Sequence, residues 1–273
     1  MLQIPKSIHQ TFPTKQLPPH LSDNPSQLQE RNPGWSYQLY DDQDILDFIG
    51  SVYGNDTLDV YLKIDPAYGA ARADFFRYLL MYERGGVYLD IKSMATRPLG
   101  DVLTLDESFV LSRWRNKPGE EFEGSGMHPE LAAFPGGELQ QWFIICEPRH
   151  PYLAAVIDTV TRNVLNYRAW KGGVGRTGVL RVTGPIAYTK AIEPIKTMHR
   201  HVQINTHDDI GLRYNAFGTL DHRVFFKSHY TRMDTAIVQP TGMIGMAGDA
   251  YLAVRRVKNR LITPKHLRGK KRP

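Results

Sequence analysis

Residues 68–93 constrain the fold more than any other part of the chain. The first half of this segment is rich in alanine, leucine and other helix-favouring residues. Gly85 and Gly86 should end that helix, because glycine adopts left-handed backbone conformations without steric cost. Residues 87–91 then have the composition of a buried strand, interrupted by Asp90. A buried carboxylate without a partner is costly, so we expect Asp90 at the strand end or beside a donor or cation.

Three charged side chains of this segment form a candidate ligand site. Asp74 and Arg77 are three residues apart and therefore share a face of the predicted helix. Ligands of open α/β sheets bind outside the carboxyl ends of strands, which is where we expect Asp90. An acid and a base on a helix, close to an acid at a strand end, suit recognition of a sugar nucleotide.

Helix-like and strand-like segments alternate along the chain and predict an α/β fold. Strands are expected at residues 4–12, 36–40, 87–91, 109–114, 142–146 and 224–226. Helices are expected from Asp41 or Asp42 to about Ile49, at residues 56–64, before Gly85, and at residues 151–167 and 185–198. Residues 13–25, 117–137 and 172–178 are rich in proline or glycine and predict loops. We expect one domain, residues 1–254, followed by a basic tail, residues 255–273.

The charge distribution and the cysteine content indicate which binding partners and which cellular compartment to expect. The formal net charge is +6, and much of the excess lies in the basic tail, which could meet an anionic membrane surface or be a solvated end. No aromatic-rich basic platform accompanies it, so we expect no nucleic-acid partner. The single cysteine, Cys146, favours a reducing compartment. Residues 1–10 lack the apolar core of a signal peptide, and we expect a cytoplasmic protein, peripheral to the inner face of the membrane.

The order of residues in the central segment is similar to that of a known enzyme family. Asp74, Arg77, the Gly85–Gly86 pair, Tyr88 and Asp90 resemble, in order, the sugar-binding region with a DXD motif of glycosyltransferase family 32. The same order is similar to that of the glucosyltransferase domains of clostridial toxins. Residues 4–12, 32–42, 140–153 and 183–185 also resemble the family.

The resemblance implies a GT-A type fold, a Rossmann-like mixed sheet flanked by helices, in a single domain with helical additions. It implies a retaining hexosyltransferase with a UDP- or GDP-hexose donor. By the resemblance Asp74 and Arg77 hold the donor sugar, and Asp90 contacts the donor and helps to bind a metal. The expected donor-binding residues are His9, Gln10, Arg72, Asp74, Arg77, Tyr88, Asp90, Lys92 and Gly184, although His9 could equally be a packed core histidine.

Lys92 stands where the family has the second acid of its DXD motif. A protonated lysine carries donors only and cannot ligate a cation. Either its ammonium group meets the diphosphate directly, or Mn²⁺ or Mg²⁺ is bound by Asp90 with a later residue. His229 is our choice for that residue, with Asp221 and His222 as further candidates.

Several acceptors and one non-catalytic function remain open on sequence grounds. The expected acceptor is a hydroxyl group of a glycan, a lipid-linked sugar or a protein, in polysaccharide or glycoconjugate synthesis. The alternatives are an effector-type protein glycosyltransferase, or a non-catalytic sugar-nucleotide or glycan-binding protein that lost its chemistry with the second acid.

Overall fold

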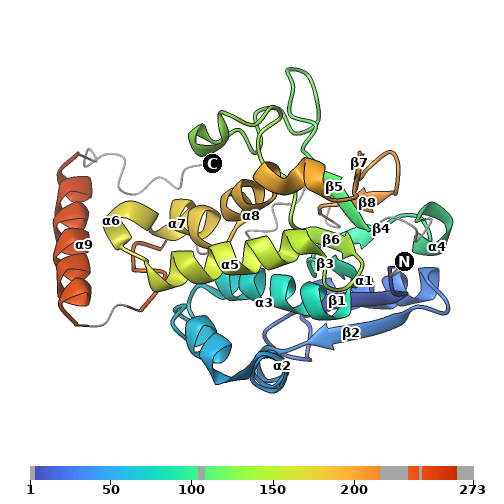
Figure 1. The fold of residues 1–273 in the computed structure, drawn as a ribbon, viewed down its shortest axis with the longest axis horizontal. Helices are drawn as coiled ribbons and strands as arrows, with labels where there is room; N and C mark the ends of the chain where they lie inside the picture. The colour runs from blue at the N-terminus through green and yellow to red at the C-terminus, as the bar shows by residue number, and fades with distance from the viewer. Residues whose placement is uncertain (1–3, 104–107, 216–232, 240–241, 263–273) are drawn as a thin grey trace.

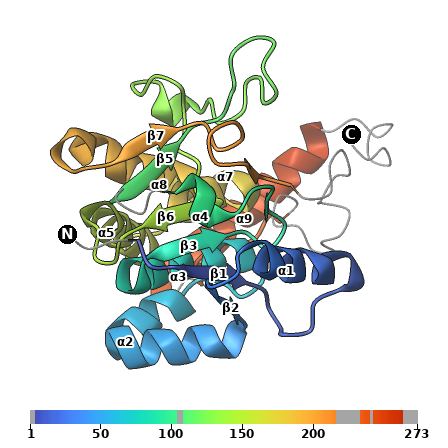
Figure 2. The same ribbon diagram turned by 90° about the vertical axis from the view of Figure 1, so that its right-hand side faces the viewer.

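A mixed six-stranded sheet forms the centre of the molecule. The computed structural model describes residues 4–103, 108–215, 233–239 and 242–262. The strands of the main sheet are β1 (Ser7–Thr11), β2 (Ser36–Tyr40), β3 (Gly86–Leu89), β5 (Phe109–Ser112), β6 (Phe143–Cys146) and β7 (Val202–Ile204). Their order is β2-β1-β3-β6-β5-β7, which Figure 2 shows from bottom to top. Two short strands, β4 (Met94–Ala95) and β8 (Leu212–Arg213), pair separately.

The sheet consists of two halves that join between β3 and β6. β2, β1 and β3 run parallel, whereas β6 is antiparallel to both β3 and β5. Leu89 pairs with Phe143 at the end of this junction, so Asp90 and the residues before β6 lie at the same edge of the sheet. Ligands of open α/β sheets bind outside the carboxyl ends of strands, and Asp90 lies at that end of β3.

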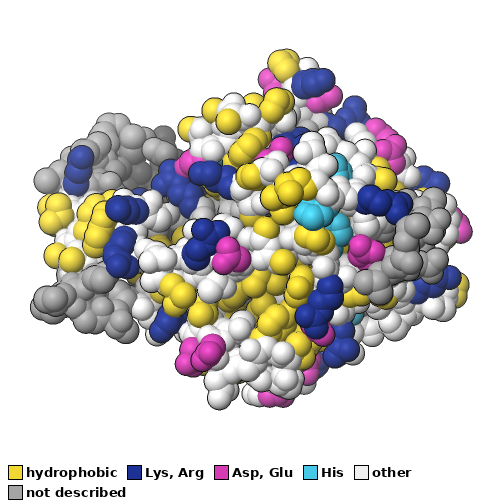
Figure 3. All heavy atoms as spheres, viewed as in Figure 1, with side chains coloured by type: hydrophobic (Ala, Val, Ile, Leu, Met, Phe, Trp, Pro, Cys, Tyr) yellow, Lys and Arg dark blue, Asp and Glu magenta, His cyan; other side chains and the backbone are white. Residues whose placement is uncertain are grey.

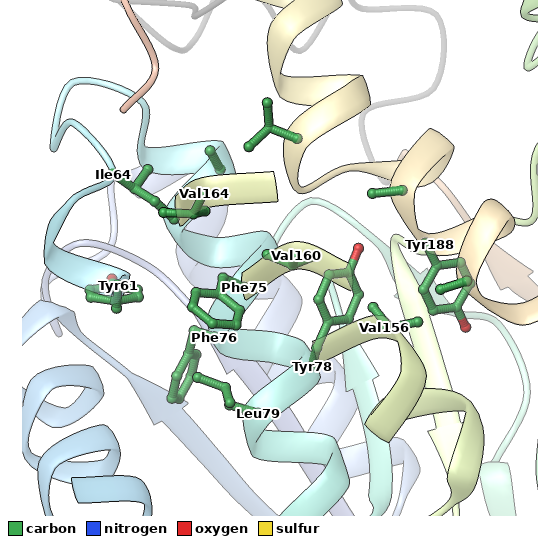
Figure 4. Packing of buried hydrophobic residues seen from close by; sticks show 14 of the residues in the cluster. Tyr61, Ile64, Phe75, Phe76, Tyr78, Leu79, Val156, Val160, Val164 and Tyr188 are labelled. Atoms are coloured by element: carbon green, nitrogen blue, oxygen red, sulfur yellow. The ribbon is translucent and has the colours of Figure 1, made fainter. Parts of the chain in front are cut away.

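Helices cover both faces of the sheet (Figure 1). They are α1 (Pro19–Arg31), α2 (Asp42–Leu62), α3 (Gly69–Arg84), α4 (Leu99–Val102), α5 (Pro151–Leu165), α6 (Ala169–Gly172), α7 (Gly175–Val182), α8 (Pro185–Ile192) and α9 (Gly242–Ile262), with short 3₁₀ turns at Pro129–Leu131 and Glu193–Met198. The helices α3 and α5 pack on one face, where Phe75 and Tyr78 lie against Val156 and Val160 (Figure 4). On the other face, side chains of α1, α4 and β8 pack in a second core cluster.

The predicted α/β architecture, a mixed sheet flanked by helices, is confirmed. The expected helix at residues 41–49 and the short helix at residues 56–64 join in α2, with a kink at Gly54, whose φ is 78°. The described part of the chain also contains β4, β7, β8 and α9, which the sequence patterns did not reveal. The expected strand at residues 224–226 lies outside the described residues, and the boundary proposed after residue 254 falls within α9.

Two predicted loops are only partly correct, and packing explains both. Residues 13–25 were expected to be a loop, but α1 begins at Pro19, a position where proline fits a helix. Leu21 and Leu28 of α1 are both 1 % exposed, so burial outweighs the cost of Pro25 in the helix. Residues 172–178 include the start of α7, and a Cβ on Gly178 would lie 2.3 Å from the Ile237 side chain. Gly178 is thus a close-packing residue.

Candidate functional site

Asp74, Arg77 and Asp90 meet at the junction between the two halves of the sheet, as predicted. The Nη2 atom of Arg77 lies 3.3 Å from the Oδ1 atom of Asp74, one helical turn before it in α3. Its Nη1 atom lies 3.0 Å from the Oδ1 atom of Asp90, the first residue after β3. One guanidinium therefore joins a carboxylate from a helix to a carboxylate from a strand end, and its planar fork suits this bridging.

Gln141 completes this cluster from the other side of the junction. Its Oε1 atom accepts a hydrogen bond of 2.9 Å from Arg77, and its Nε2 atom donates one of 3.1 Å to Asp74. Thr183, just before α8, donates through Oγ1 to the second oxygen of Asp74 at 3.0 Å. Sequence reasoning missed both residues, although each lies in a segment that resembles the family; the only local signal was a polar residue directly beside an apolar element.

The two carboxylates of the cluster differ in how much of each side chain is exposed to solvent. Only 5 % of the Asp74 side chain is exposed, against 21 % for Asp90. Burial raises the pKa of Asp74 to about 6, although Arg77, Gln141 and Thr183 oppose the rise. Burial alone would lower the pKa of Arg77, but Asp90, Tyr88 and Asp74 outweigh it and raise that pKa. Asp74 thus fixes the guanidinium from inside, whereas Asp90 is the carboxylate more accessible to a ligand.

Two further predicted donor-binding residues contact Asp90 or its neighbours. The phenol of Tyr88 lies 3.5 Å from Oδ1 of Asp90 and 3.0 Å from the hydroxyl of Thr11, and its ring lies under the Arg77 guanidinium at 4.8 Å. Gln10 donates from Nε2 to the backbone carbonyl of Asp90 at 3.2 Å. The end of β1 is therefore tied directly to the end of β3.

Lys92 lies on the same loop, two residues beyond Asp90. Its Nζ atom donates to the phenol oxygen of Tyr214 at 2.7 Å and lies 4.0 Å from the centre of that ring. The loop itself is held by Asn24, which donates to the carbonyls of Ile91 and Ser93 at 2.9 and 2.7 Å. The ammonium group thus has a fixed place beside the cluster, on the side of β8.

Two of the other predicted donor-binding residues, His9 and Arg72, form hydrogen bonds with residues outside the Asp74–Arg77–Asp90 cluster. His9 is 5 % exposed, and its two ring nitrogens lie within hydrogen-bond distance of the hydroxyl groups of Ser7 and Tyr40. Burial lowers the pKa of His9 to about 4. Arg72 donates from both Nε and Nη2 to the carbonyl of Ile64. Gly184 begins α8, next to Thr183, where a Cβ would lie 3.0 Å from backbone atoms of Val179 and Leu180. Asp221, His222 and His229 lie outside the described residues.

The described residues do not form a metal site by themselves. Within the described ranges, no group of three or more His, Cys, Asp or Glu side chains is arranged to hold a metal ion. Asp90 is a hard oxygen ligand, but the nearby Arg77 and Lys92 are cations and repel a divalent ion. Glycosyltransferases with a DXD motif nevertheless generally use a divalent cation.

Comparisons with known sequences agree with the resemblance seen in the central segment. Residues 18–110 match the family model described as "Glycosyltransferase sugar-binding region containing DXD motif". The initiation-specific alpha-1,6-mannosyltransferase of Candida albicans is 26% identical over 203 residues, which cover 69% of this chain and 52% of that protein. Inositol phosphoceramide mannosyltransferase 3 of Schizosaccharomyces pombe is 28% identical over 166 residues, covering 60% and 39%. The chain thus spans about half or less of the length of these relatives.

Solved structures give more distant likenesses. The PaToxG glycosyltransferase is 17% identical with a TM-score of 0.46, and the match covers 71% of this chain and 70% of that one. The UDP-bound glycosyltransferase domain of the YGT toxin is 12% identical with a TM-score of 0.41, covering 85% and 60%. The family match, by contrast, includes Asp74, Arg77, Asp90 and Lys92. Residues 18–110 of this chain are therefore similar to the sugar-binding region of glycosyltransferases with a DXD motif.

Proposed function

We propose that this protein is a retaining glycosyltransferase that moves a hexose from a UDP- or GDP-hexose to an acceptor hydroxyl in polysaccharide or glycoconjugate synthesis. The observation that carries the proposal is the Asp74–Arg77–Asp90 cluster at the sheet junction, inside the matched sugar-binding region. Among hexoses, mannose is favoured by the names of the relatives.

The cluster suits a ligand with several hydroxyl groups and a negatively charged end. Asp90 accepts hydrogen bonds from hydroxyl groups, and Arg77 holds its carboxylate in place. Lys92 lies beside it, on a loop fixed by Asn24, and its ammonium suits a phosphate oxygen. A bound Mn²⁺ or Mg²⁺ would supply further charge at the diphosphate; Asp90 is the described residue that could ligate it, with His229 proposed as a second ligand.

The transfer forms one bond and breaks another. The acceptor oxygen bonds to the anomeric carbon, the bond from that carbon to the diphosphate oxygen breaks, and the hydroxyl proton passes to the departing diphosphate. Negative charge grows on the leaving diphosphate, so fixed cations near it stabilise the transition state. Lys92 is the group that we assign to this role.

The test is a thermal-shift screen with nucleotide sugars, with and without Mn²⁺, followed by release of nucleoside diphosphate. A ligand that binds only the folded state raises its melting temperature. Asp90→Asn and Asp74→Asn should lower turnover at least a hundredfold while the protein stays folded. Asp158→Asn, an exposed carboxylate on α5, is the control and should match wild type. Wild-type turnover in both site variants would refute the assignment; nucleotide-sugar binding without any release would favour the non-catalytic alternative.

We also propose that the protein meets the cytoplasmic, anionic face of a membrane through its basic tail, residues 255–273, which begins within α9. Val254 and Val257 are 68% and 56% exposed, beside the exposed Arg256 and Lys258. Figure 3 shows hydrophobic and basic side chains together at the left edge, where α9 lies. Among the described residues no helix is long and apolar enough to cross a bilayer. Sedimentation with vesicles that contain phosphatidylserine, but not with pure phosphatidylcholine, is the expected result; equal sedimentation with both would contradict it.

A further inference from the structure

A cavity of about 430 Å³ adjoins the Asp74–Arg77–Asp90 cluster, with Trp142, the backbone partner of Asp90, in its lining. Four aromatic side chains and several polar ones line it, among them Trp114, Phe122, Trp142, Tyr214, Gln140 and Thr206. Its volume lies within the range of about 300–1,000 Å³ that is usual for small-molecule sites, and such sites combine aromatic walls with a few polar groups.

The cavity and the cluster share walls. The backbone N–H of Asp90 donates to the carbonyl of Trp142 at 2.8 Å. Gln141, which holds Asp74 and Arg77, lies between Gln140 and Trp142, and both of these line the cavity. Two binding sites for two substrates of one transfer reaction must adjoin in this way.

We infer that this cavity binds a sugar unit of the acceptor, so that the acceptor is a carbohydrate rather than a protein or a bare lipid. The inference rests on the proposed function and specifies its acceptor. A pyranose ring has an apolar face of C–H groups and a rim of hydroxyl groups. Aromatic walls suit the first, and polar side chains suit the second.

The aromatic walls are already in place. The ring of Trp114 lies 4.8 Å from that of Phe122 and 5.1 Å from that of Tyr214, which in turn lies 5.7 Å from Trp142. Trp114 is also held from behind, because its Nε1 donates to Glu138 at 2.7 Å. A preformed pocket needs little reorganisation when its ligand binds.

Polar groups of the cavity fit hydroxyl ligands. Gln140 accepts from Thr206 at 3.2 Å inside the lining. The indole Nε1 of Trp142 is the one buried side-chain nitrogen or oxygen in the described part of the chain without a hydrogen-bond partner. That group is a donor only, and a buried donor without an acceptor is unfavourable. A ligand oxygen that reached this nitrogen from the cavity would supply the acceptor that Trp142 lacks.

The position of the cavity favours the acceptor over the donor nucleotide. Trp114 follows β5 by two residues, Thr206 follows β7 by two, and Trp142 precedes β6 directly, so these three lining residues belong to the β6-β5-β7 half of the sheet. Residues 212–215, in and after β8, form a further wall, and through Tyr214 this wall contacts Lys92. The predicted donor-binding residues His9 and Gln10 lie in β1, in the parallel half of the sheet. A nucleobase could also stack on aromatic rings, and the experiment must separate the two ligands.

The experiment compares Trp114→Ala with Trp114→Phe, which keeps a ring, and with Trp170→Ala, an exposed tryptophan of α6 at the opposite end of the molecule from β5 (Figure 1). The probes are methyl α-mannoside, methyl α-glucoside, methyl β-galactoside and α-1,6-linked mannobiose. Saturation-transfer NMR measures their binding to each variant. Phe122→Ala is a second pocket variant in case Trp114→Ala does not fold, with melting temperature as the folding check.

We expect at least one glycoside to bind wild type, and Trp114→Ala to raise the KM for that acceptor at least tenfold. The KM should rise much less in Trp114→Phe and should not change in Trp170→Ala. The rate of donor hydrolysis without acceptor should stay within twofold of the wild-type rate in all variants. Unchanged glycoside binding in folded Trp114→Ala and Phe122→Ala would overturn the inference, as would weaker binding of UDP or GDP in these variants. Failure of the proposed function is distinct, because wild type would then release no nucleoside diphosphate from any donor.

Discussion

Arg77 shows how one side chain can connect elements that are distant in the sequence. Its guanidinium contacts a carboxylate of α3, a carboxylate after β3 and the carbonyl of Gln141 before β6. Removing it would leave Asp74 buried without its cation, and breaking such a pair costs about 3–5 kcal/mol. For this reason the variants of the carboxylates, rather than of Arg77, are the informative tests of function.

Lys92 allows a prediction at the same scale. Lys92→Ala should weaken binding of the nucleoside diphosphate at least tenfold, because the ammonium is assigned to the diphosphate. Lys92→Asp restores the family's second acid, so its binding should instead depend on Mn²⁺. Calorimetric titration with and without Mn²⁺ measures both effects.

Lys190→Ala, an exposed lysine of α8, is the control for Lys92 and should bind as wild type does. If Lys92→Ala binds the diphosphate as tightly as wild type, the ammonium does not contact it and the metal-dependent alternative is favoured.

At the scale of elements, the turn between α3 and β3 decides where Asp90 lies. Gly85 and Gly86 have φ values of +62° and +92°, which are unfavourable for other residues. A Cβ on Gly86 would also lie 2.6 Å from the carbonyl oxygen of Ser7 in β1. The double glycine therefore ends the helix, and it also lets β3 approach β1 closely enough to pair.

Gly86→Ala tests this close approach. Gly34→Ala is a matched control, since Gly34 has a φ of +80° but nothing within 4 Å of its Cβ position. Both variants carry left-handed strain of about 1–2 kcal/mol, and we expect Gly86→Ala to lose at least about 1 kcal/mol more. Urea unfolding measures the difference; equal losses would show that the backbone conformation alone requires Gly86.

For the molecule as a whole, buried titratable groups set the stability at acid pH. Burial lowers the pKa values of His9 and His150 to about 4. Between about pH 6.5 and 4 the unfolded chain binds protons that these folded histidines do not, so stability falls as the pH falls. Asp74, with a pKa raised to about 6, acts in the opposite direction. Each shift corresponds to about 3 kcal/mol at 1.36 kcal/mol per pKa unit, so the two histidines outweigh the one aspartate.

We therefore expect the melting temperature to fall between pH 6.5 and 4.5. His150→Asn removes one of the two histidines and keeps an acceptor at the N-terminus of α5, where His150 accepts from the N–H of Tyr152. Its melting temperature should fall less steeply over the same range. An identical slope in wild type and variant would show that His150 contributes nothing to acid sensitivity.

The sequence alone determined the central helix, its glycine stop, the buried strand and the common face of Asp74 and Arg77, because each depends on residues close together in the chain. It also carried the resemblance to a sugar-binding region, through the order of Asp74, Arg77, Gly85–Gly86, Tyr88 and Asp90. The loops at residues 13–25 and 172–178 were partly mispredicted because burial of Leu28 and close packing of Gly178 are not local properties.

Only the tertiary structure decided which side chains complete the site. Gln141, Thr183 and Tyr214 come from 64 to 122 residues away, and they reach Asp74, Arg77 or Lys92 through the pairing of β3 with β6 and the packing of α8 and β8. The cavity beside the cluster likewise exists only after these strands are ordered. Local patterns specify elements, whereas the free energy of packing selects the partners that those elements bring together.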